Sequence, residues 1–470
     1  MKIGIIDTAK RLVHNKNFIC IACSAFVCIL SIILSCFINI PGEISYILFS
    51  AFAIILLLLM TRKLFIRYVN IDNRKLTLIA SAITSLLGLI IYVVIVYGRN
   101  FEYVFDHTCY YDQQHELLNL FLNNPLKGFA GIILSFWNSD YSYFINVILG
   151  VPFLLTDGSH EAYVITYYIV LLIPVIIMYN VLVTNACQKF SIDRKLLFIF
   201  ISNFLFLTFP LIHMASIMGM PDLFGMFFVF SITLIMFNAN FLNTGFKFCF
   251  EVALLSIMLV ITRRWYLFWL LGFIPCILIL SFIKSIHVKN MKKVFFGELK
   301  FALVYILTFF ILMGPFIYKT LFVKNYAEDY SQWYIGGFWY EWYNQLGYLG
   351  ILFAIILVIG IVYGLINKEL RFQTIVCIFG LVLSIYFFTL VQNMGKHQSL
   401  CLLGYYLVFA HNFLLFAVSI KNRLLRGILL GFVFIVLIFN SVSTMACLYD
   451  DINGLFLTTK YAIGARFSWK

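Results

Sequence analysis

The chain is poor in charge. Of its 470 residues only 11% are Asp, Glu, Lys or Arg, whereas 63% are hydrophobic. A soluble globular protein has about a quarter charged residues and about half apolar ones. So little charge could not coat the surface of a soluble chain of this length, and a soluble fold is therefore excluded.

Several functional motifs are also missing. The sequence contains no Gly-rich phosphate loop ending in Lys-Ser or Lys-Thr, no Gly-x-Ser-x-Gly and no His-Glu-x-x-His. ATP-driven transport is therefore not indicated. The net charge of +13 sits in short clusters between apolar runs, without the basic stripe that follows a phosphate backbone, so nucleic acid is not an expected partner.

What the chain has instead is a series of apolar runs of about 20 residues, the length that spans ~30 Å of hydrocarbon. These runs predict an all-α integral membrane protein with about 13 transmembrane helices, beginning with an uncleaved first span after the basic N-terminus. The predicted spans are 18–40, 44–60, 76–97, 162–184, 196–213, 223–242, 247–262, 265–283, 299–318, 346–365, 372–391, 400–419 and 427–446.

Charge orients these spans. With a cytoplasmic N-terminus, 23 of the 33 Lys and Arg residues fall on the inner side, and 14 of the 20 acidic residues fall on the outer side. The Lys and Arg bias is the positive-inside pattern, so we expect the C-terminus to be outside. Cys109 and Cys447 both face outward in this topology, which leaves a disulfide between them geometrically open.

Three predicted parts follow from this topology: an N-terminal hairpin (1–75), a central module (76–300) with an outer loop at 98–162, and a C-terminal module (301–470) with an outer aromatic loop at 318–347 and an outer tail. Two apolar stretches of the first loop, 128–137 and 141–155, are too short to span. We expect interfacial helices there, with a dip into the membrane as the alternative. The inner loops are short, so the chemistry is expected outside.

The first candidate site is an acidic segment directly after the third span. Acidic groups beside a low-dielectric wall can have a raised pKa and act as general bases. A solvated acidic loop is the alternative interpretation. The segment contains Glu102, Asp106, His107, Asp112, His115 and Glu116.

The second candidate site is Arg263-Arg264, which interrupts a long apolar stretch at a predicted outer turn. Charge near the membrane is costly, and two cations on the outer side run against the positive-inside trend. Guanidinium groups bind phosphate with two parallel hydrogen bonds, which favours an anion site over a simple turn between helices.

Two further outer turns carry polar groups. In the first, Gln392, Lys396 and His397 offer hydrogen bonds, a charge and a titratable ring, although a polar hairpin turn explains them equally. In the second, Asp222 follows a proline at a span start, where an acid is also an ordinary helix N-terminal residue. No tight metal-ligand spacing is present, and no cofactor is expected, with a metal requirement left open.

At the first loop the chain resembles the GT-C superfamily of membrane glycosyltransferases. Asp106 falls on the family's catalytic acid, His107 stands where a second acid is usual, and Tyr110 and Tyr111 fall on an aromatic pair. The Arg263-Arg264 and Lys396-His397 turns are similar to outer turns that hold the donor phosphate. The resemblance covers about residues 76 to 420 and is specific only at the loop opening.

The resemblance implies an inverting enzyme of a bacterial inner membrane. It would move a sugar from a polyprenyl-phosphate carrier to a surface glycan or lipid-linked acceptor, as for O-antigen, capsule or another cell-envelope polysaccharide. Asp106 would be the general base, and Arg263, Arg264, Lys396 and His397 would hold the departing phosphate. Aromatics of 333–343 would anchor at the interface or stack on sugars.

Two other functions remain open from the sequence. A surface-polysaccharide polymerase would have the same topology and would transfer a whole glycan. A lipid-linked glycan flippase or transporter should carry polar residues at mid-span positions, of which few stand out.

Overall fold

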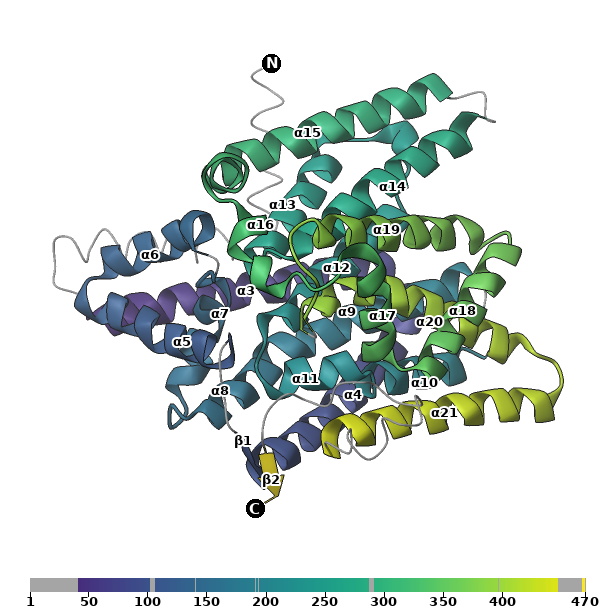
Figure 1. Cartoon of the computed structure of the whole chain (residues 1–470), viewed down its shortest axis with the longest axis horizontal. Coiled ribbons are helices and arrows are strands. Elements are labelled where there is room, and N and C mark those ends of the chain that lie inside the picture. Colours follow the sequence, from purple (N-terminus) through teal and green to yellow (C-terminus); the bar gives the residue numbers. More distant parts are fainter. Residues whose placement is uncertain are drawn as a thin grey trace.

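The computed structural model describes residues 41–101, 106–139, 141–190, 192, 194–286, 291–395, 397–446 and 467–469, and almost all of these are helical (Figure 1). Seven helices of the described part are long and apolar enough to cross a membrane. They are α3 (Gly42–Tyr68), α4 (Ile71–Gly98), the continuous run of α8 (His160–Tyr167), η1 (Tyr168–Leu172) and α9 (Ile173–Lys189), then α14 (Tyr266–Ile286), α15 (Met291–Tyr318), α19 (Arg371–Thr389), and the run of η5 (Gln398–Leu402) and α20 (Leu403–Ser419).

An eighth span is counted if a bent pair is one span. The helices α17 (Gly337–Leu349) and α18 (Ile351–Ile366) meet at 108°. Gly350 joins them with φ of 78°, a left-handed conformation that residues with a side chain rarely adopt. Two helices that are long enough to cross a membrane only together, and that meet at this angle, form a broken span or a re-entrant loop.

The remaining elements are shorter, apart from the last helix. They are β1 (Arg99–Phe101), α5 (Asp106–Asn123), α6 (Pro125–Asn138), α7 (Phe144–Leu154), α10 (Lys195–Leu207), α11 (Pro210–Ile217), α12 (Pro221–Phe237), η2 (Phe241–Asn243), α13 (Phe246–Thr262), η3 (Lys319–Val323), α16 (Tyr326–Asp329), η4 (Ser331–Trp333), α21 (Arg423–Ala446) and β2 (Phe467–Trp469). The strands β1 and β2 pair antiparallel, which places the C-terminal end of the chain beside the end of α4.

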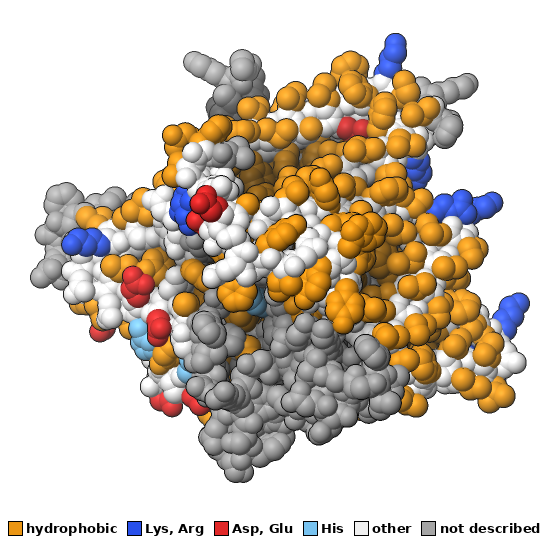
Figure 2. Space-filling view, in the orientation of Figure 1, with side chains coloured by type: hydrophobic (Ala, Val, Ile, Leu, Met, Phe, Trp, Pro, Cys, Tyr) orange, Lys and Arg blue, Asp and Glu red, His pale blue; other side chains and the backbone are white. Residues whose placement is uncertain are grey.

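The surface of the molecule is apolar along its long helices. Leu58, Phe310 and Ile311 are more than half exposed, and Figure 2 shows hydrophobic side chains over most of the described part of that face. A soluble monomer rarely exposes apolar patches of this extent. Together with the helix lengths, this surface shows a membrane protein.

Charge separates the two ends of the helix bundle. In Figure 2 most of the visible Lys and Arg side chains lie toward the right edge, with a few at the left, whereas acidic side chains and His lie mainly to the left. The right edge is formed by the connections between α14 and α15, between α18 and α19, and between α20 and α21 (Figure 1). We call the right and left sides of this view the basic end and the acidic end, and the orientation of the chain across a membrane stays a prediction.

The core is built around α12. Every residue of this helix from Pro221 to Met236 is buried, and α9, α13, η5 and α20 pack around it. A helix that is apolar on all sides needs such a surrounding shell. The N-terminus of α12 therefore lies inside the bundle, near the turns that the sequence analysis singled out.

Two helix pairs pack closely through glycine. A Cβ on Gly272 of α14 would lie 2.4 Å from the Gly380 carbonyl of α19, and one on Gly360 of α18 would lie 1.9 Å from the Phe409 carbonyl of α20. Small residues at such crossings let helix backbones approach in membranes.

Replacing Gly360 with Ala will lower the thermal stability of the detergent-solubilised protein, because the added methyl group forces α18 away from α20. The expected loss is on the order of 1–3 kcal/mol, as for other overpacked sites. Gly427→Ala in α21 is the matched control, because nothing lies within 4 Å of a Cβ there. Equal melting temperatures for the two variants would contradict the close approach.

The predicted spans can be compared with these helices. Each predicted span from residue 44 onward overlaps a helix or helix run of the structure, whereas the first, 18–40, lies outside the described residues. The all-helical membrane class is confirmed. The total of about 13 spans stays a prediction, since seven or eight candidate spans are found in the described part.

The two apolar stretches of the loop after α4 form the helices α6 and α7. α6 is amphipathic and exposes Leu126 and Leu134, as an interfacial helix would. In contrast, α7 is buried along most of its length and packs against the candidate span α3. The apolar residues of α7 are thus covered by protein, and its position at the interface or within the membrane stays a prediction.

Candidate functional site

A buried ion pair lies at the N-terminus of α12. Arg263, the residue that ends α13, places its Nε 3.4 Å from Oδ1 and 3.3 Å from Oδ2 of Asp222. The two side chains are 5% and 2% exposed. Asp222 is in the first turn of α12, where the helix dipole also favours a negative charge. The pair joins two of the residues that the sequence analysis chose for separate reasons.

Aromatic side chains surround this pair. Arg263 donates a hydrogen bond to the hydroxyl of Tyr110, and its guanidinium lies 5.6 Å from the ring centre of Tyr110 and 5.3 Å from that of Tyr141. The hydroxyl of Tyr266 donates to the backbone carbonyl of Asp222. We call Tyr110, Tyr141, Asp222 and Arg263 the Arg263 cluster. It joins α5 of the first loop to α12 and α13.

Arg264 points to a different part of the fold. Its guanidinium lies 4.5 Å from the ring centre of Phe316, near the end of α15, and its Nη1 is 3.4 Å from the hydroxyl of Tyr326 in α16. It is partly exposed, whereas Arg263 is buried. The two arginines therefore have different environments: one is held inside by an acid and the other stands closer to solvent on an aromatic support.

The turn before η5 packs beside this cluster. Gln398 accepts hydrogen bonds from the Gln392 side chain (3.0 Å) and from the Gly395 backbone (2.7 Å), and these bonds close the turn. The helix η5 packs against α12 and α14, which begin at Pro221 and Tyr266. His397 is half-buried in this turn, and Lys396 lies outside the described residues. Three of the predicted outer turns thus meet around the start of α12.

The opening of the first loop is described only in part. Glu102 lies outside the described residues, and for Asp106 and His107 the structure gives the backbone alone. Asp106 begins α5, four residues before Tyr110. Residues four apart lie on one face of a helix, so Asp106 is placed on the face that carries Tyr110.

Tyr111 and Asp112 do not belong to the Arg263 cluster. The Tyr111 ring stacks on His160 with centroids 4.5 Å apart, and its hydroxyl donates to the Gly158 carbonyl at 2.7 Å. Burial and the nearby acidic groups, Asp112 first among them, raise the pKa of Tyr111, which keeps this hydroxyl neutral. Asp112 itself is exposed. Tyr110 and Tyr111, the predicted aromatic pair, therefore make contacts with different parts of the fold.

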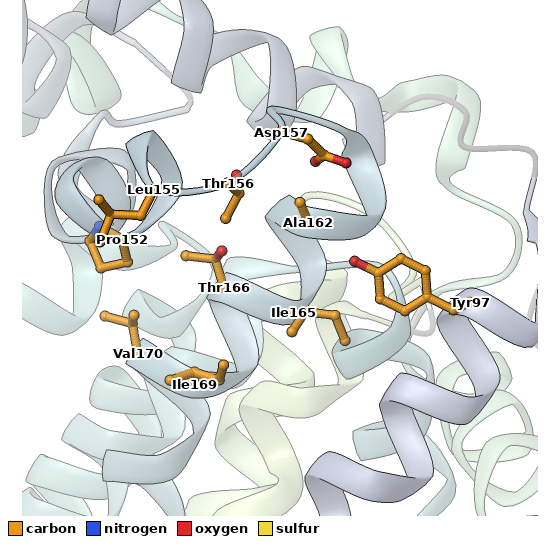
Figure 3. Close-up of a pocket in the computed structure, with 10 residues that line it drawn as sticks. All are labelled: Tyr97, Pro152, Leu155, Thr156, Asp157, Ala162, Ile165, Thr166, Ile169 and Val170. Carbon is orange, nitrogen blue, oxygen red and sulfur yellow. The ribbon is translucent and has the colours of Figure 1, made fainter.

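A separate groove of about 430 Å³ lies between the end of α4 and the start of α8. Figure 3 shows Tyr97, Asp157 and Thr166 around it, together with aliphatic side chains such as Ile169. It is lined by no residue of the Arg263 cluster and by no Lys or Arg. The groove is thus a distinct feature that offers no counter-charge to a phosphate.

The structure also shows buried polar side chains that were not predicted from the sequence to be functional. Glu341 in α17 is fully buried among amide donors. Deeper in the bundle, the Tyr179 hydroxyl and the His411 ring are 2.8 Å apart, and Asn180 and Asn203 exchange two hydrogen bonds. For Glu341 a signal was available in the sequence: polar residues follow it on α17 at three, four and seven positions, which places them on one face of the helix.

No group of three or more His, Cys, Asp or Glu side chains within the described ranges is arranged to hold a metal ion. Cys447 lies outside those ranges, so its pairing with Cys109 stays a prediction.

Comparisons with known proteins give no relative: no protein-family model, no curated protein and no solved structure matches this chain.

Proposed function

We propose that this protein is an inverting glycosyltransferase. It moves a sugar from a polyprenyl-phosphate carrier to a glycan or lipid-linked acceptor on the outer face of a bacterial inner membrane. One observation supports this most: α5, the α12–α13 hairpin and η5, which come from three distant parts of the sequence, meet around the start of α12. Asp222 and Arg263 thereby lie close to η5, which directly follows His397, and Arg264 is the next residue after Arg263.

Within this proposal Asp106 is the general base. It removes the proton of the acceptor hydroxyl as the oxygen attacks the anomeric carbon, and the bond from that carbon to the carrier phosphate breaks. Its place one helical turn before Tyr110 supports this role, because Tyr110 is bonded to the Arg263 cluster. The carrier supplies an activated leaving group, so ATP is not required.

The phosphate that leaves needs positive charge. Arg264 and His397, with Lys396, are proposed to hold it and to stabilise its growing charge. Arg263 is assigned a different role from the one expected from the sequence. Because it is buried and paired with Asp222, it fixes the position of α5 and α12 rather than presenting its charge to a ligand.

Deletion of the gene in the source organism will remove one sugar substituent from a surface glycan and leave the chain length unchanged, because one sugar is transferred per reaction. Linkage analysis and gel profiles of the purified glycan measure both properties. Shortened chains with intact side branches would instead indicate a polymerase.

The transporter alternative has one observation in its favour, namely the buried Tyr179–His411 and Asn180–Asn203 contacts. Intramembrane polar residues often line a transport path. In this chain the contacts join α9, α10 and α20 to one another, as hydrogen bonds between packed helices do. A deletion strain that accumulates a complete lipid-linked glycan on the cytoplasmic side would favour transport.

A further inference from the structure

Helix α17 is amphipathic, but its polar face is buried and its aromatic face is exposed. Its exposed face carries Trp339 and Tyr343, which are 81% and 52% exposed. Its buried face carries a polar stripe, with Glu341 0% and Gln345 2% exposed. The stripe, at helical positions i, i+3, i+4 and i+7, consists of Glu341, Asn344, Gln345 and Tyr348. Polar groups are costly to bury, so this face should have specific partners.

The partners of Glu341 lie in the turn before η5. One carboxylate oxygen, Oε2, accepts hydrogen bonds from the backbone N–H of Met394 (2.9 Å) and from the side-chain amide of Asn393 (3.0 Å). The other oxygen, Oε1, accepts from Gln345 (2.7 Å) and, at 3.5 Å, from Asn344. The carboxylate is thus satisfied by amide donors, and it fixes the backbone of the turn directly.

The rest of the stripe holds the same turn. Asn344 and Tyr348 both donate to the Met394 carbonyl, each at 2.9 Å, and Gln345 donates to the Ser399 hydroxyl at 2.7 Å. The stripe therefore holds both backbone groups of Met394 and the first turn of η5. His397 lies between these two fixed points in the sequence.

The turn continues into the proposed phosphate site. η5 packs against α12, the helix that begins with Asp222 of the Arg263 cluster, and against α14. The polar stripe of α17 is hydrogen-bonded to η5 through Gln345 and Ser399 and to the turn before it through Glu341 and Met394. Any displacement of the turn would move His397 relative to the start of α12.

We infer that Glu341 is a positioning residue: through Met394 and Asn393 it holds the turn that places His397 at the phosphate site. The inference rests on the proposed function. Glu341 is fully buried, and its hydrogen bonds go to α17 and to the turn, so in this inference it acts through the turn.

A carboxylate, and not merely a side chain of its shape, is required at this position. Glutamine at position 341 has one oxygen and one NH₂ group. Whichever way its amide is turned, two of the four N–H donors that now contact the carboxylate would face the NH₂ group, which is itself a donor. The Met394 N–H cannot reorient. Gln345 can do so only by losing its bonds with Ser399 and with the Tyr406 hydroxyl, which donates to its Oε1 at 3.0 Å.

The test uses the full-length protein in detergent, with geranyl phosphate as the probe. In Glu341→Gln we expect backbone hydrogen exchange in the peptide containing 393–399 to accelerate about tenfold or more, as loss of a charged hydrogen-bond acceptor predicts. Exchange in α14 and α19 should stay as in the wild type. Binding of geranyl phosphate should weaken about tenfold, as it should in His397→Ala.

Two further variants complete the experiment. Glu369→Gln removes an exposed carboxylate in the turn between α18 and α19 and should change neither measurement. If Glu341→Gln does not fold, Asn344→Ala, which removes one bond to the Met394 carbonyl, replaces it.

The outcomes separate the inference from the proposed function. Faster exchange together with weaker binding supports the inference. If the wild type binds geranyl phosphate and Glu341→Gln binds it equally well, or if the exchange of 393–399 is unchanged, the inference is overturned and the proposed function stands. A wild-type protein that does not bind the probe overturns both.

Discussion

Cells that carry Asp106→Asn in place of the wild-type protein will lose the same sugar substituent as the deletion strain. The amide cannot accept the proton of the acceptor hydroxyl, and loss of a general base lowers a rate by about 10²–10⁴-fold. Linkage analysis of the glycan measures the substituent, and an immunoblot of the membrane fraction measures the amount of protein. The variant should be present at the wild-type level, because the two side chains have the same shape.

Asp157→Asn is the control for this experiment. Asp157 lies in an exposed turn between α7 and α8, outside the Arg263 cluster, and its carboxylate accepts hydrogen bonds from Ser159. This substitution should leave the glycan as in the wild type. A wild-type glycan in the Asp106→Asn strain would remove Asp106 from the mechanism and leave Glu102 and Asp112 as the next acids to test.

The second large effect concerns the buried ion pair. Asp222→Asn will destabilise the protein by about 3–5 kcal/mol, because the Arg263 charge stays buried without its carboxylate. The double variant Asp222→Asn with Arg263→Met should recover part of this loss, since no buried charge is then left uncompensated. Thermal unfolding in detergent, followed for Asp222→Asn, Arg263→Met and the double variant, gives the coupling between the two side chains.

An exposed ion pair provides the comparison. Lys63 and Glu251 lie 2.9 Å apart, but the lysine side chain is half exposed. Lys63→Gln should therefore cost no more than about 1 kcal/mol. If the losses from the two Asp222–Arg263 single variants simply add in the double variant, the pair is not coupled and the cluster does not organise the site.

The sequence predicted more of the cluster's members than of its contacts. Arg263 stood out as a charge on the wrong side for the positive-inside trend, and Asp222 as an acid at a helix start. Their pairing follows from α12 and α13 being an antiparallel hairpin, which brings the first turn of one beside the last turn of the other. It was missed because each residue was considered within its own turn.

Other contacts had no local signal. Tyr110 meets Arg263 across 153 positions, and nothing in the spacing of the chain indicates which of its many tyrosines does so. Glu341 was overlooked because the aromatic residues of its segment pointed to a membrane interface. The polar residues at every third or fourth position of that segment, which face inward, were the stronger evidence about its role.

The predicted spans show a second limit of prediction from the sequence. Apolar length predicts where helices lie, and the described helices agree with it. It does not tell a lipid-facing helix from one that is covered by protein, since both are apolar. For this reason the sequence did not predict that α7 is covered by protein and packs against α3.

The site consists of the α12–α13 hairpin and of a turn that comes later in the sequence, so its parts are synthesised at different times. A ribosome adds about 5–20 residues per second, and protein folds from the N-terminus as it emerges. Asp222 and Arg263 are made well before Met394, so the hairpin exists for on the order of ten seconds before the turn that covers it.

During this interval η5 is not yet available to shield the start of α12. The ion pair can form without it, because both partners belong to the hairpin, and Tyr110 is already synthesised. A newly made chain can therefore pair the buried charges of Asp222 and Arg263 before it receives the segment that carries His397.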